Sequence, residues 1–417
     1  MQKTRITAAA IVLAAAAPAS ADSATDWWEL ASKFNFAQQV SSMPAPPETQ
    51  RASARAALAT FEAVNAIDPR YESYLGFPAA SPSGSQDAAA ATAAFRVLLQ
   101  HYPHNKKHLE ESYAMAMAQL PDGPGKQAGV AIGEQAAQAV LAHGGVDPAI
   151  QQVPYRPRTR PGVWIGASPP SLEPYWEAFK PWVAKSTGAL PPPPPPPLNS
   201  AIWARDYEEV RRLGARASKE RSELQTLIAQ YRQGYDLSPM VRFIADRPGR
   251  RQVDNARLFA LYHMAMDDAV QAMIVAKLKY NYWRPITAIR NGDGDGNDAT
   301  GRDAAWTPLL PTPNFPEYPC GHCTAVAVQA EVLRLAGGLP ASTPVRIAAG
   351  GNPNLVVQSV KSWDEAVRQV SDGRMFGGVH YRFSNDAGEE IGRKAARLTI
   401  QSVLRALPQG RRGKGGK

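Results

Sequence analysis

Apolar residues recur at helical spacing along most of the chain. In Arg51–Ile67 they fall three and four positions apart, and the pattern ends at Asp68-Pro69, a helix stop. Asn255–Tyr280 is apolar over more than one face, which predicts a helix buried at the centre of a bundle. Further helices are predicted over Trp27–Phe36, Gln86–His101, Lys107–Leu120, Gly125–His143, Tyr207–Leu213, Glu220–Gln233, His322–Leu335, Asp364–Phe376 and Asp386–Leu407. Alternating patterns stay short, so the predicted fold class is all-α.

Two details refine this picture of the elements. Asp386 with Glu389 three residues later predicts a capping box at the start of the last helix. The stretch 286–318 is rich in Gly, Asp and Pro, and a loop of this length in a compact domain is usually functional.

Changes in composition divide the chain into five parts. Residues 1–21 form a predicted signal peptide, 22–146 an N-terminal helical region, and 147–200 a proline-rich connector. Residues 201–408 form the predicted catalytic helical bundle, and 409–417 a basic tail. Within the connector, the seven consecutive prolines from Pro191 to Pro197 predict extended polyproline II structure, because proline cannot sit inside a helix.

The first residues have the pattern of a secretory signal. Lys3 and Arg5 precede the apolar stretch Ile6–Ala17, and Ala19-Ser20-Ala21 fits the small-x-small cleavage rule. The later uncharged run 186–204 contains seven consecutive prolines and is not a continuous apolar stretch, so the mature protein is expected to have no membrane span and to be periplasmic or secreted. In an oxidising compartment the two cysteines can form a disulfide.

The net charge of +9 comes partly from the basic tail. Basic residues are not interleaved with aromatic ones in a stripe, which argues against a nucleic-acid partner. Asp293, Asp295 and Asn297 have the alternation of a calcium loop, but Ala304 stands at the twelfth position, where such a loop needs Glu. A solvated turn is the alternative. The sequence leaves the oligomeric state open, including a homo-oligomer.

Three segments place charge and histidine where a helical core should be apolar. They are Lys277–Pro285, with Lys277 and Arg284 seven residues apart; Pro319–His322, a glycine turn opening a helix; and Arg374–His380. Fixed cations and the amide groups of a helix start suit a phosphate-like anion. One histidine could act in line as a nucleophile or ligand, and the other could transfer protons.

In order and spacing these segments resemble the superfamily that unites vanadium-dependent haloperoxidases with type 2 phosphatidic acid phosphatases and bacterial acid phosphatases. Its signature is K-x6-R-P, then P-S-G-H, then S-R-x5-H-x3-D. The match runs from Lys277 to His380. The resemblance implies a helical bundle of the haloperoxidase and acid phosphatase type, which binds vanadate as cofactor and uses hydrogen peroxide and halide as substrates.

The resemblance also implies roles for individual residues. His380 would be the vanadium ligand, or the phosphate-accepting nucleophile of a phosphatase acting on phosphomonoesters, and His322 the general acid–base. Phe315 matches the chloroperoxidase pattern and, with Trp283, would line the halide pocket. The oxyanion of vanadate or phosphate would be bound by Lys277, Arg284, Cys320, Gly321 and Arg374.

Three positions differ from the signature. Cys320 replaces the usual serine, Gly373 precedes the last arginine, and Ser384 stands where an aspartate normally orients the nucleophilic histidine. The missing aspartate weakens the case for a phosphatase, but a periplasmic acid phosphatase stays an alternative. Cys320 and Ser384 also leave open a catalytically silent anion-binding protein. A Cys-x-x-Cys oxidoreductase would need a thioredoxin-like strand before Cys320, and the pattern predicts none.

Overall fold

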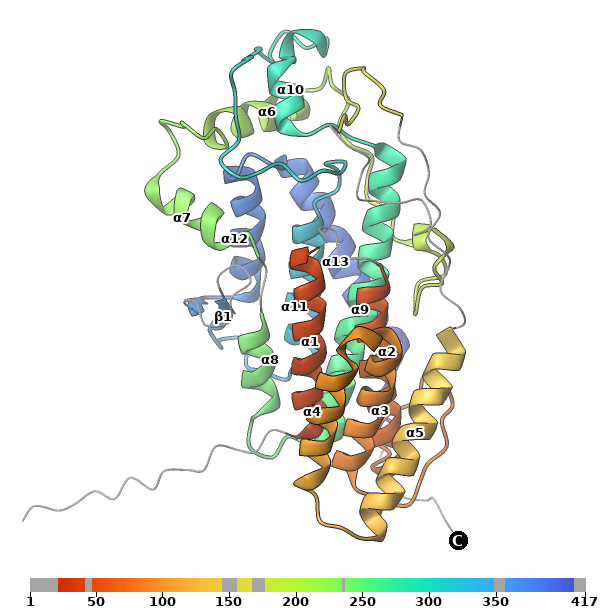
Figure 1. Cartoon of the computed structure of the whole chain (residues 1–417). Helices are drawn as coiled ribbons and strands as arrows, with labels where there is room; N and C mark the ends of the chain where they lie inside the picture. Colours follow the sequence, from red (N-terminus) through yellow and green to blue (C-terminus); the bar gives the residue numbers. More distant parts are fainter. Residues whose placement is uncertain are drawn as a thin grey trace, which may run out of the picture.

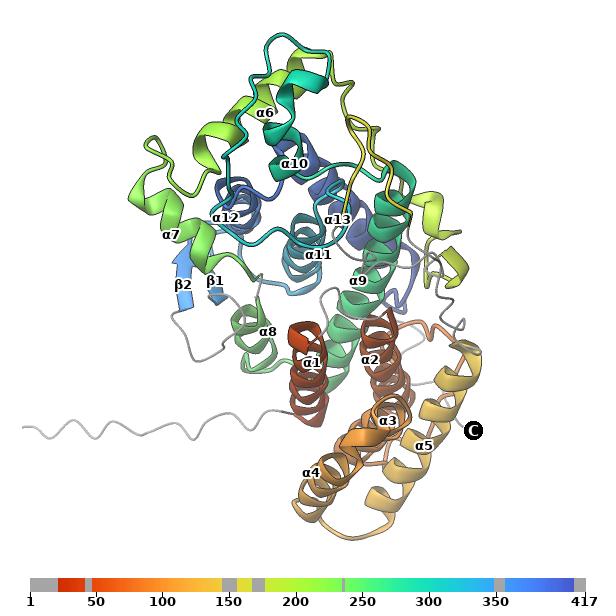
Figure 2. The ribbon, with the colours of Figure 1, turned by 45° about the horizontal axis from the view of Figure 1, so that its top comes forward.

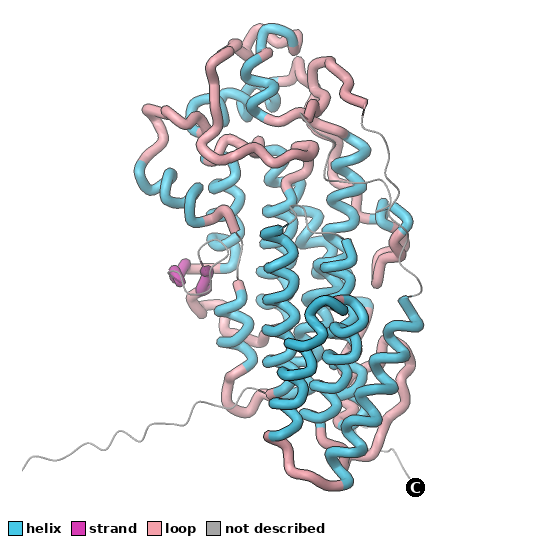
Figure 3. The backbone as a smooth tube through the Cα atoms, viewed as in Figure 1, coloured by secondary structure: helices cyan, strands magenta, loops and turns pink. Residues whose placement is uncertain are grey.

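The computed structural model describes residues 22–41, 47–144, 156–166, 177–234, 237–348 and 357–408. The predicted signal peptide and basic tail lie outside this described part. Within it the architecture is helical (Figures 1 and 3), as predicted. The N-terminal helices are α1 (Ser23–Ser41), α2 (Pro47–Ile67), α3 (Gln86–His101), η1 (Pro103–Asn105), α4 (Lys106–Ala118) and α5 (Pro124–Gly144). The later helices are η3 (Thr187–Ala189), α6 (Ala201–Leu213), α7 (Glu223–Tyr231), α8 (Ser238–Ala245), α9 (Gln252–Tyr280), α10 (Pro285–Arg290), η4 (Gly292–Gly294), α11 (Gly321–Ala336), α12 (Trp363–Phe376) and α13 (Arg382–Ser402).

Local chemistry fixes several helix starts. The Ser85 hydroxyl accepts a hydrogen bond from the backbone of Ala88 at the start of α3, and Ser222 forms a capping box with Gln225 at the start of α7. The predicted capping box at Asp386 is wrong. The last helix already begins at Arg382, so Asp386 lies inside it.

Two strands lie at the edge of the bundle (Figure 3). β1 (Val345–Ala348) pairs antiparallel with β2 (Val357–Val360), with Val345 opposite Val360. Each strand has four residues, which agrees with the observation that alternating apolar and polar patterns in the sequence stay short. The strands lie beside α8 and α12, away from the helix ends that carry the three charged motif segments (Figures 1 and 2).

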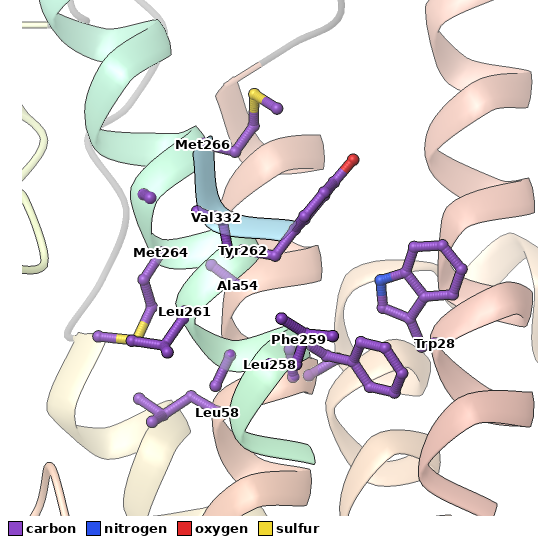
Figure 4. Close-up of a cluster of buried hydrophobic side chains, with 14 of the residues drawn as sticks. Trp28, Ala54, Leu58, Leu258, Phe259, Leu261, Tyr262, Met264, Met266 and Val332 are labelled. Carbon is purple, nitrogen blue, oxygen red and sulfur yellow. The ribbon is translucent and has the colours of Figure 1, made fainter. Parts of the chain in front are cut away.

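One hydrophobic core joins the N-terminal helices to the C-terminal bundle. Trp28 of α1, Leu58 of α2, Phe259 of α9 and Val332 of α11 belong to the same cluster (Figure 4). The rings of Trp28 and Phe259 stack with their centroids 5.2 Å apart. The helix α9 is therefore buried from several sides, as its sequence predicts. A second cluster, around Trp203, lies where α6 and α10 cover the end of the bundle.

Polar groups on α9 tie other segments to this core. Asp268 accepts hydrogen bonds from the backbone amides of Trp182 (2.7 Å), Val183 (2.9 Å) and Ala184 (3.0 Å). Burial raises the pKa of Asp268 to about 6. It is thus a core carboxylate whose hydrogen bonds are satisfied by backbone amides. His263 differs, because both of its ring nitrogens are buried and neither has a hydrogen-bond partner within the part of the chain that the structure describes.

The connector contacts the bundle at defined points. Its segment 156–166 pairs with the turn after α9, where the amide of Trp164 donates to the Asn281 carbonyl (2.8 Å). The Tyr318 hydroxyl donates to the carbonyl of Pro193 within the proline run, which has no helix or strand. Among the described residues, no helix combines the length and apolar character needed to cross a membrane.

Candidate anion-binding site

Three segments that are far apart in sequence meet at the end of the bundle capped by α6 and α10 (Figure 1). Lys277 lies in the last turn of α9, and Arg284 directly precedes α10. Gly321 begins α11, and Arg374 lies in the last turn of α12. His380 follows in the short link to α13. The spacing of the sequence motifs thus corresponds to helix ends gathered at one place.

Backbone carbonyls hold the two cations of the first segment. Lys277 Nζ donates to the carbonyls of Pro316 (3.0 Å) and Glu317 (2.8 Å). Arg284 Nη1 donates to the Val379 carbonyl at 2.8 Å. The residues before α11 and those after α12 therefore both wrap around these side chains, which are 0% and 1% exposed.

The positive charges in the site are mutually unfavourable. Burial lowers the pKa of Lys277 well below its usual value, and the charges of Arg284 and Arg374 lower it further. Burial likewise lowers the pKa of Arg284 to about 9. Glu317 opposes these effects with one negative charge. A multiply charged anion between the cations would reduce this electrostatic cost.

Glu317 is a site residue that the sequence analysis missed. Its Oε1 lies 2.6 Å from His380 Nδ1, and it also accepts the amide of Tyr381 (3.1 Å). Burial raises the pKa of Glu317 to about 7, while Arg284, Lys277 and the Ser384 hydroxyl act to lower it. The available signal was an acidic residue in the apolar, proline-bounded stretch FPEYPCGHCT.

His322, on the first turn of α11, is fixed by another segment. Its Nε2 lies 2.8 Å from the carbonyl oxygen of Gln233, so Nε2 carries the proton that is donated. The lone pair is then on Nδ1. Burial lowers the pKa of His322 well below its usual value, and the positive charge of Arg374 is the next cause.

Two glycines before His380, Gly377 and Gly378, permit close backbone packing. The carbonyl of Gly377 accepts the Leu310 amide at 2.9 Å. Gly378 has φ +75°, and a Cβ there would lie 2.5 Å from the Gly214 carbonyl oxygen. The backbone at Gly377 and Gly378 therefore packs tightly against the end of α6 and against the segment before α11.

The Cys-Gly-His-Cys turn contains a disulfide between Cys320 and Cys323. The Cys320 sulfur accepts the Cys323 amide (3.2 Å), and the Cys320 amide donates to the Ser384 carbonyl (3.1 Å). Cys320 thus has no S–H or amide hydrogen to offer, and the expectation that it binds an oxyanion has no donor to support it. The amide of Gly321 lies in the first turn of α11, where helical amides lack an intrahelical acceptor.

The two residues expected in a halide pocket lie in different surroundings. The ring of Phe315 lies over both cations, with its centroid 5.4 Å from Lys277 Nζ and 4.8 Å from Arg284 Cζ. Trp283 instead stacks on Trp203 at 5.7 Å within the second apolar cluster. The structure therefore places the Phe315 ring beside the cations and the Trp283 ring in the second apolar cluster.

The Asp-rich loop is used for internal contacts. Asp295 accepts hydrogen bonds from Trp203 Nε1 (2.8 Å), the Thr300 hydroxyl (2.8 Å) and the Asn297 amide (2.9 Å). Over the described ranges, no group of three or more His, Cys, Asp or Glu residues is arranged to hold a metal ion.

These features fit an oxyanion rather than a metal cation. Lys277, Arg284 and Arg374 are 0%, 1% and 5% exposed, and Glu317 is the carboxylate that acts on the first two. His380 presents Nε2 toward Arg284 Nη1 at 3.2 Å. The site can therefore surround an oxyanion with cations and place a histidine nitrogen among them.

Comparisons with known proteins agree with this geometry. Residues 257–409 match the family model described as the VCPO second helical-bundle domain. A comparison with curated protein sequences gives no match. A solved structure titled as the first bacterial vanadium-dependent iodoperoxidase has a TM-score of 0.73 and 22% identity, over 92% of this chain and 98% of that chain. A holo-type bacterial vanadium-dependent chloroperoxidase has a TM-score of 0.66 and 17% identity, over 85% and 92%. These likenesses show the fold.

Proposed function

We propose that this chain, whose helical bundle belongs to the vanadium haloperoxidase superfamily, is a vanadate-dependent haloperoxidase that oxidises halide with hydrogen peroxide. The observation that carries the proposal is the buried cluster of Lys277, Arg284 and Arg374 around His380. Vanadate is the oxyanion cofactor that such a cluster would hold. When bound, it supplies the Lewis acidity that activates peroxide toward a halide.

The chain's own residues have separate tasks in this proposal. Lys277, Arg284, Arg374 and the Gly321 amide bind the oxyanion and balance its charge. His380 provides Nε2 as the vanadium ligand. Burial keeps the pKa of His380 well below its usual value, and the neighbouring cations lower it further, so the ring is neutral and one ring nitrogen carries a lone pair.

His322 is suited to proton transfer. Its Nε2–H donates to the Gln233 carbonyl, so the lone pair is on Nδ1, which is the nitrogen that can accept a proton from peroxide and return it to an oxygen atom. The half-buried Phe315 ring beside Lys277 and Arg284 gives a halide an apolar wall next to positive charge. This combination lowers the cost of removing water from a halide.

The test is halogenation by the vanadate-loaded protein. The purified protein is incubated with orthovanadate, and bromination of a phenol dye is followed with peroxide and bromide. Arg284→Ala should weaken vanadate binding about 10–100-fold, because a charge-assisted hydrogen-bonding group is lost, and should abolish turnover. The exposed Arg302→Ala is the matched control and should keep both properties. Full activity of Arg284→Ala would refute the anion site.

A periplasmic acid phosphatase is the second candidate, favoured by the contact between Glu317 and His380. This carboxylate can orient a nucleophilic histidine although Ser384 replaces the usual aspartate. Hydrolysis of p-nitrophenyl phosphate in the absence of vanadate, inhibited by added vanadate and lost in His380→Ala, would support the phosphatase. Absence of both hydrolysis and halogenation would leave an anion-binding protein.

We further propose that the protein acts in the periplasm or is secreted. The charged start, apolar stretch and Ala-Ser-Ala site within residues 1–21 support this location, as does the disulfide between Cys320 and Cys323. Expression with the native leader should give a mature N-terminus at Asp22 in the exported fraction, measured by intact mass. A full-length cytoplasmic product would contradict the proposal.

A further inference from the structure

Two contacts of the His380 ring together define its protonation. Arg284 Nη1 lies 3.2 Å from His380 Nε2, and a guanidinium can only donate. Nε2 must therefore accept and carry the lone pair. On the other side Nδ1 lies 2.6 Å from Glu317 Oε1, to which it donates its hydrogen. The two contacts require the same tautomer.

We propose that Glu317 is the positioning residue that sets the tautomer of His380 and aims its Nε2 lone pair into the anion site. This deepens the proposed function and rests on it only for the identity of the oxyanion. Glu317 takes the place of the aspartate that the superfamily signature has four residues after the histidine, where this chain has Ser384. The carboxylate comes from the turn before α11 rather than from α13.

The surroundings of Glu317 support a fixed orientation. It is 0% exposed, and the amide of Tyr381, the residue after His380, donates to the same Oε1 at 3.1 Å. The carbonyl of Glu317 itself accepts from Lys277 Nζ. One residue thus contacts the histidine, the backbone beside it and a cation of the site, so a rotation of the ring would break several hydrogen bonds.

The test compares two variants by a signal that does not depend on turnover. Histidine ¹⁵N shifts should show the Nδ1–H form of His380 in the wild type. Glu317→Gln keeps an acceptor and should keep that form, with vanadate affinity by calorimetry within a few-fold. Glu317→Met has similar length but no acceptor; it should lose the fixed tautomer and bind vanadate about 10–100-fold more weakly.

Ser384→Ala is the control for the neighbouring hydroxyl and should leave the His380 shifts unchanged. An Nε2–H form in the wild type would overturn the proposal, even if Glu317→Met fails to fold. Unchanged shifts and affinity in a folded Glu317→Met would overturn it as well. Because the tautomer is measured without vanadate, a protein that proves unable to halogenate would refute the proposed function and not this role of Glu317.

A second inference comes from a cavity of about 400 Å³ that is lined by the C-terminal end of α9 and by Pro316. Its cationic lining consists of Arg156, Arg158, Arg160 and Lys279, and its lining includes Trp164, Tyr280 and Pro316. Within the described residues, no ion pair joins these four cations to a carboxylate. Four such charges around one cavity repel each other and attract anions.

The arginine segment is attached close to the anion site. Val163 pairs with Tyr282, and the amide of Trp283 donates to the Gly162 carbonyl at 3.2 Å. These contacts fix the segment to the turn between Lys277 and Arg284. We infer that the cavity binds an organic anion with an aromatic ring, which the cations and the ring of Trp164 or Tyr280 recognise.

The probes are 2-naphthalenesulfonate and its neutral sulfonamide, measured by calorimetry with the anion site first saturated with inorganic phosphate. The sulfonate should bind at least about tenfold more tightly than the sulfonamide, since a charge-assisted contact contributes about 1.5–3 kcal/mol. The triple variant Arg156→Gln, Arg158→Gln, Arg160→Gln should lose this preference. The exposed triple Lys185→Gln, Arg216→Gln, Lys219→Gln removes equal charge elsewhere and should retain it. Equal binding of both probes, or equal losses in both triples, would overturn the inference.

Discussion

His263 is a buried imidazole in the middle of α9 whose ring nitrogens have no hydrogen-bond partner among the described residues. Its ring lies beside Tyr262, with centroids 5.0 Å apart, and 6.4 Å from the ring of Trp28. Burial lowers its pKa to about 3, so it is neutral in the folded protein at ordinary pH. The unfolded chain exposes the same ring to water, where its pKa is about 6.5. Acid therefore favours the unfolded state at this residue.

The sign and size of this effect can be predicted. The contribution of neutral His263 is fully present above pH 6.5 and is lost as the pH falls toward 3. Between pH 7.5 and 5 it amounts to about 2 kcal/mol of unfolding free energy. His263→Leu should remove this part of the pH dependence, measured by urea unfolding at both values. The exposed His104→Gln should leave the dependence unchanged; an unchanged slope in His263→Leu would contradict the argument.

The residues of the anion site were predictable to different degrees. Lys277, Arg284, Arg374 and the histidines belong to spaced motifs, so the sequence alone could group them. Glu317 could not be grouped, because its role depends on how the turn before α11 folds over His380. The environment of Trp283 is set in the same way by α6, which supplies the Trp203 ring that it stacks on.

Close packing between α11 and α13 holds the Cys-Gly-His-Cys turn against α13. A Cβ at Gly388 would lie 2.3 Å from the Cys320 carbonyl oxygen, and one at Gly392 would lie 2.3 Å from the Thr324 carbonyl oxygen. These contacts are with backbone, which cannot rotate away as a side chain can. The two glycines therefore let α13 approach the first turns of α11 closely.

Substitution of Gly392 should disturb both stability and the anion site. Gly392→Ala forces the two helices apart and should lower the unfolding free energy by about 1–3 kcal/mol. Because α11 begins at Gly321, vanadate affinity should fall with it. Gly301→Ala is the control, since a Cβ there meets no atom within 4 Å. Thermal unfolding and calorimetry measure the two effects, and equal stability of both variants would disprove the packing argument.

At the level of elements, long amphipathic helices were predicted best. The short helices α8 and α10 were missed, because eight and six residues contain too little periodicity to stand out. α10 also begins at Pro285, a residue that favours the first helical position but is otherwise associated with loops. The start of α13 was misplaced, because the Asp386–Glu389 spacing suggested a cap that the longer helix does not use.

Across the whole molecule, the N-terminal helices and the C-terminal bundle share one core and one buried ion pair. Arg51 of α2 lies 3.0 Å from Asp267 of α9, with side chains 5% and 1% exposed. Arg51 also donates to the Lys180 carbonyl (2.7 Å) and lies over the Trp182 ring. The connector is therefore held between the two halves. Such long-range pairing leaves no signal in local sequence patterns.

Breaking this pair should destabilise the protein as a unit. Arg51→Met removes the ion-pair partner of the buried Asp267 carboxylate, on which the charge of Arg55 also acts, and should lower the unfolding free energy by up to about 3–5 kcal/mol. Arg70→Met breaks the partly exposed pair with Asp68 and should lower it by less than about 1 kcal/mol. Denaturant unfolding should show one transition in each case. A separate transition for the N-terminal helices would argue against a shared core.

The disulfide between Cys320 and Cys323 affects how the protein can react with hydrogen peroxide. Hydrogen peroxide oxidises exposed thiolates stepwise, and the later steps are irreversible. Here both sulfurs are already joined to each other at the edge of the site where peroxide would be consumed. In the proposed peroxidase, a chain whose disulfide forms during folding would present no thiol of this turn to the peroxide that it later consumes.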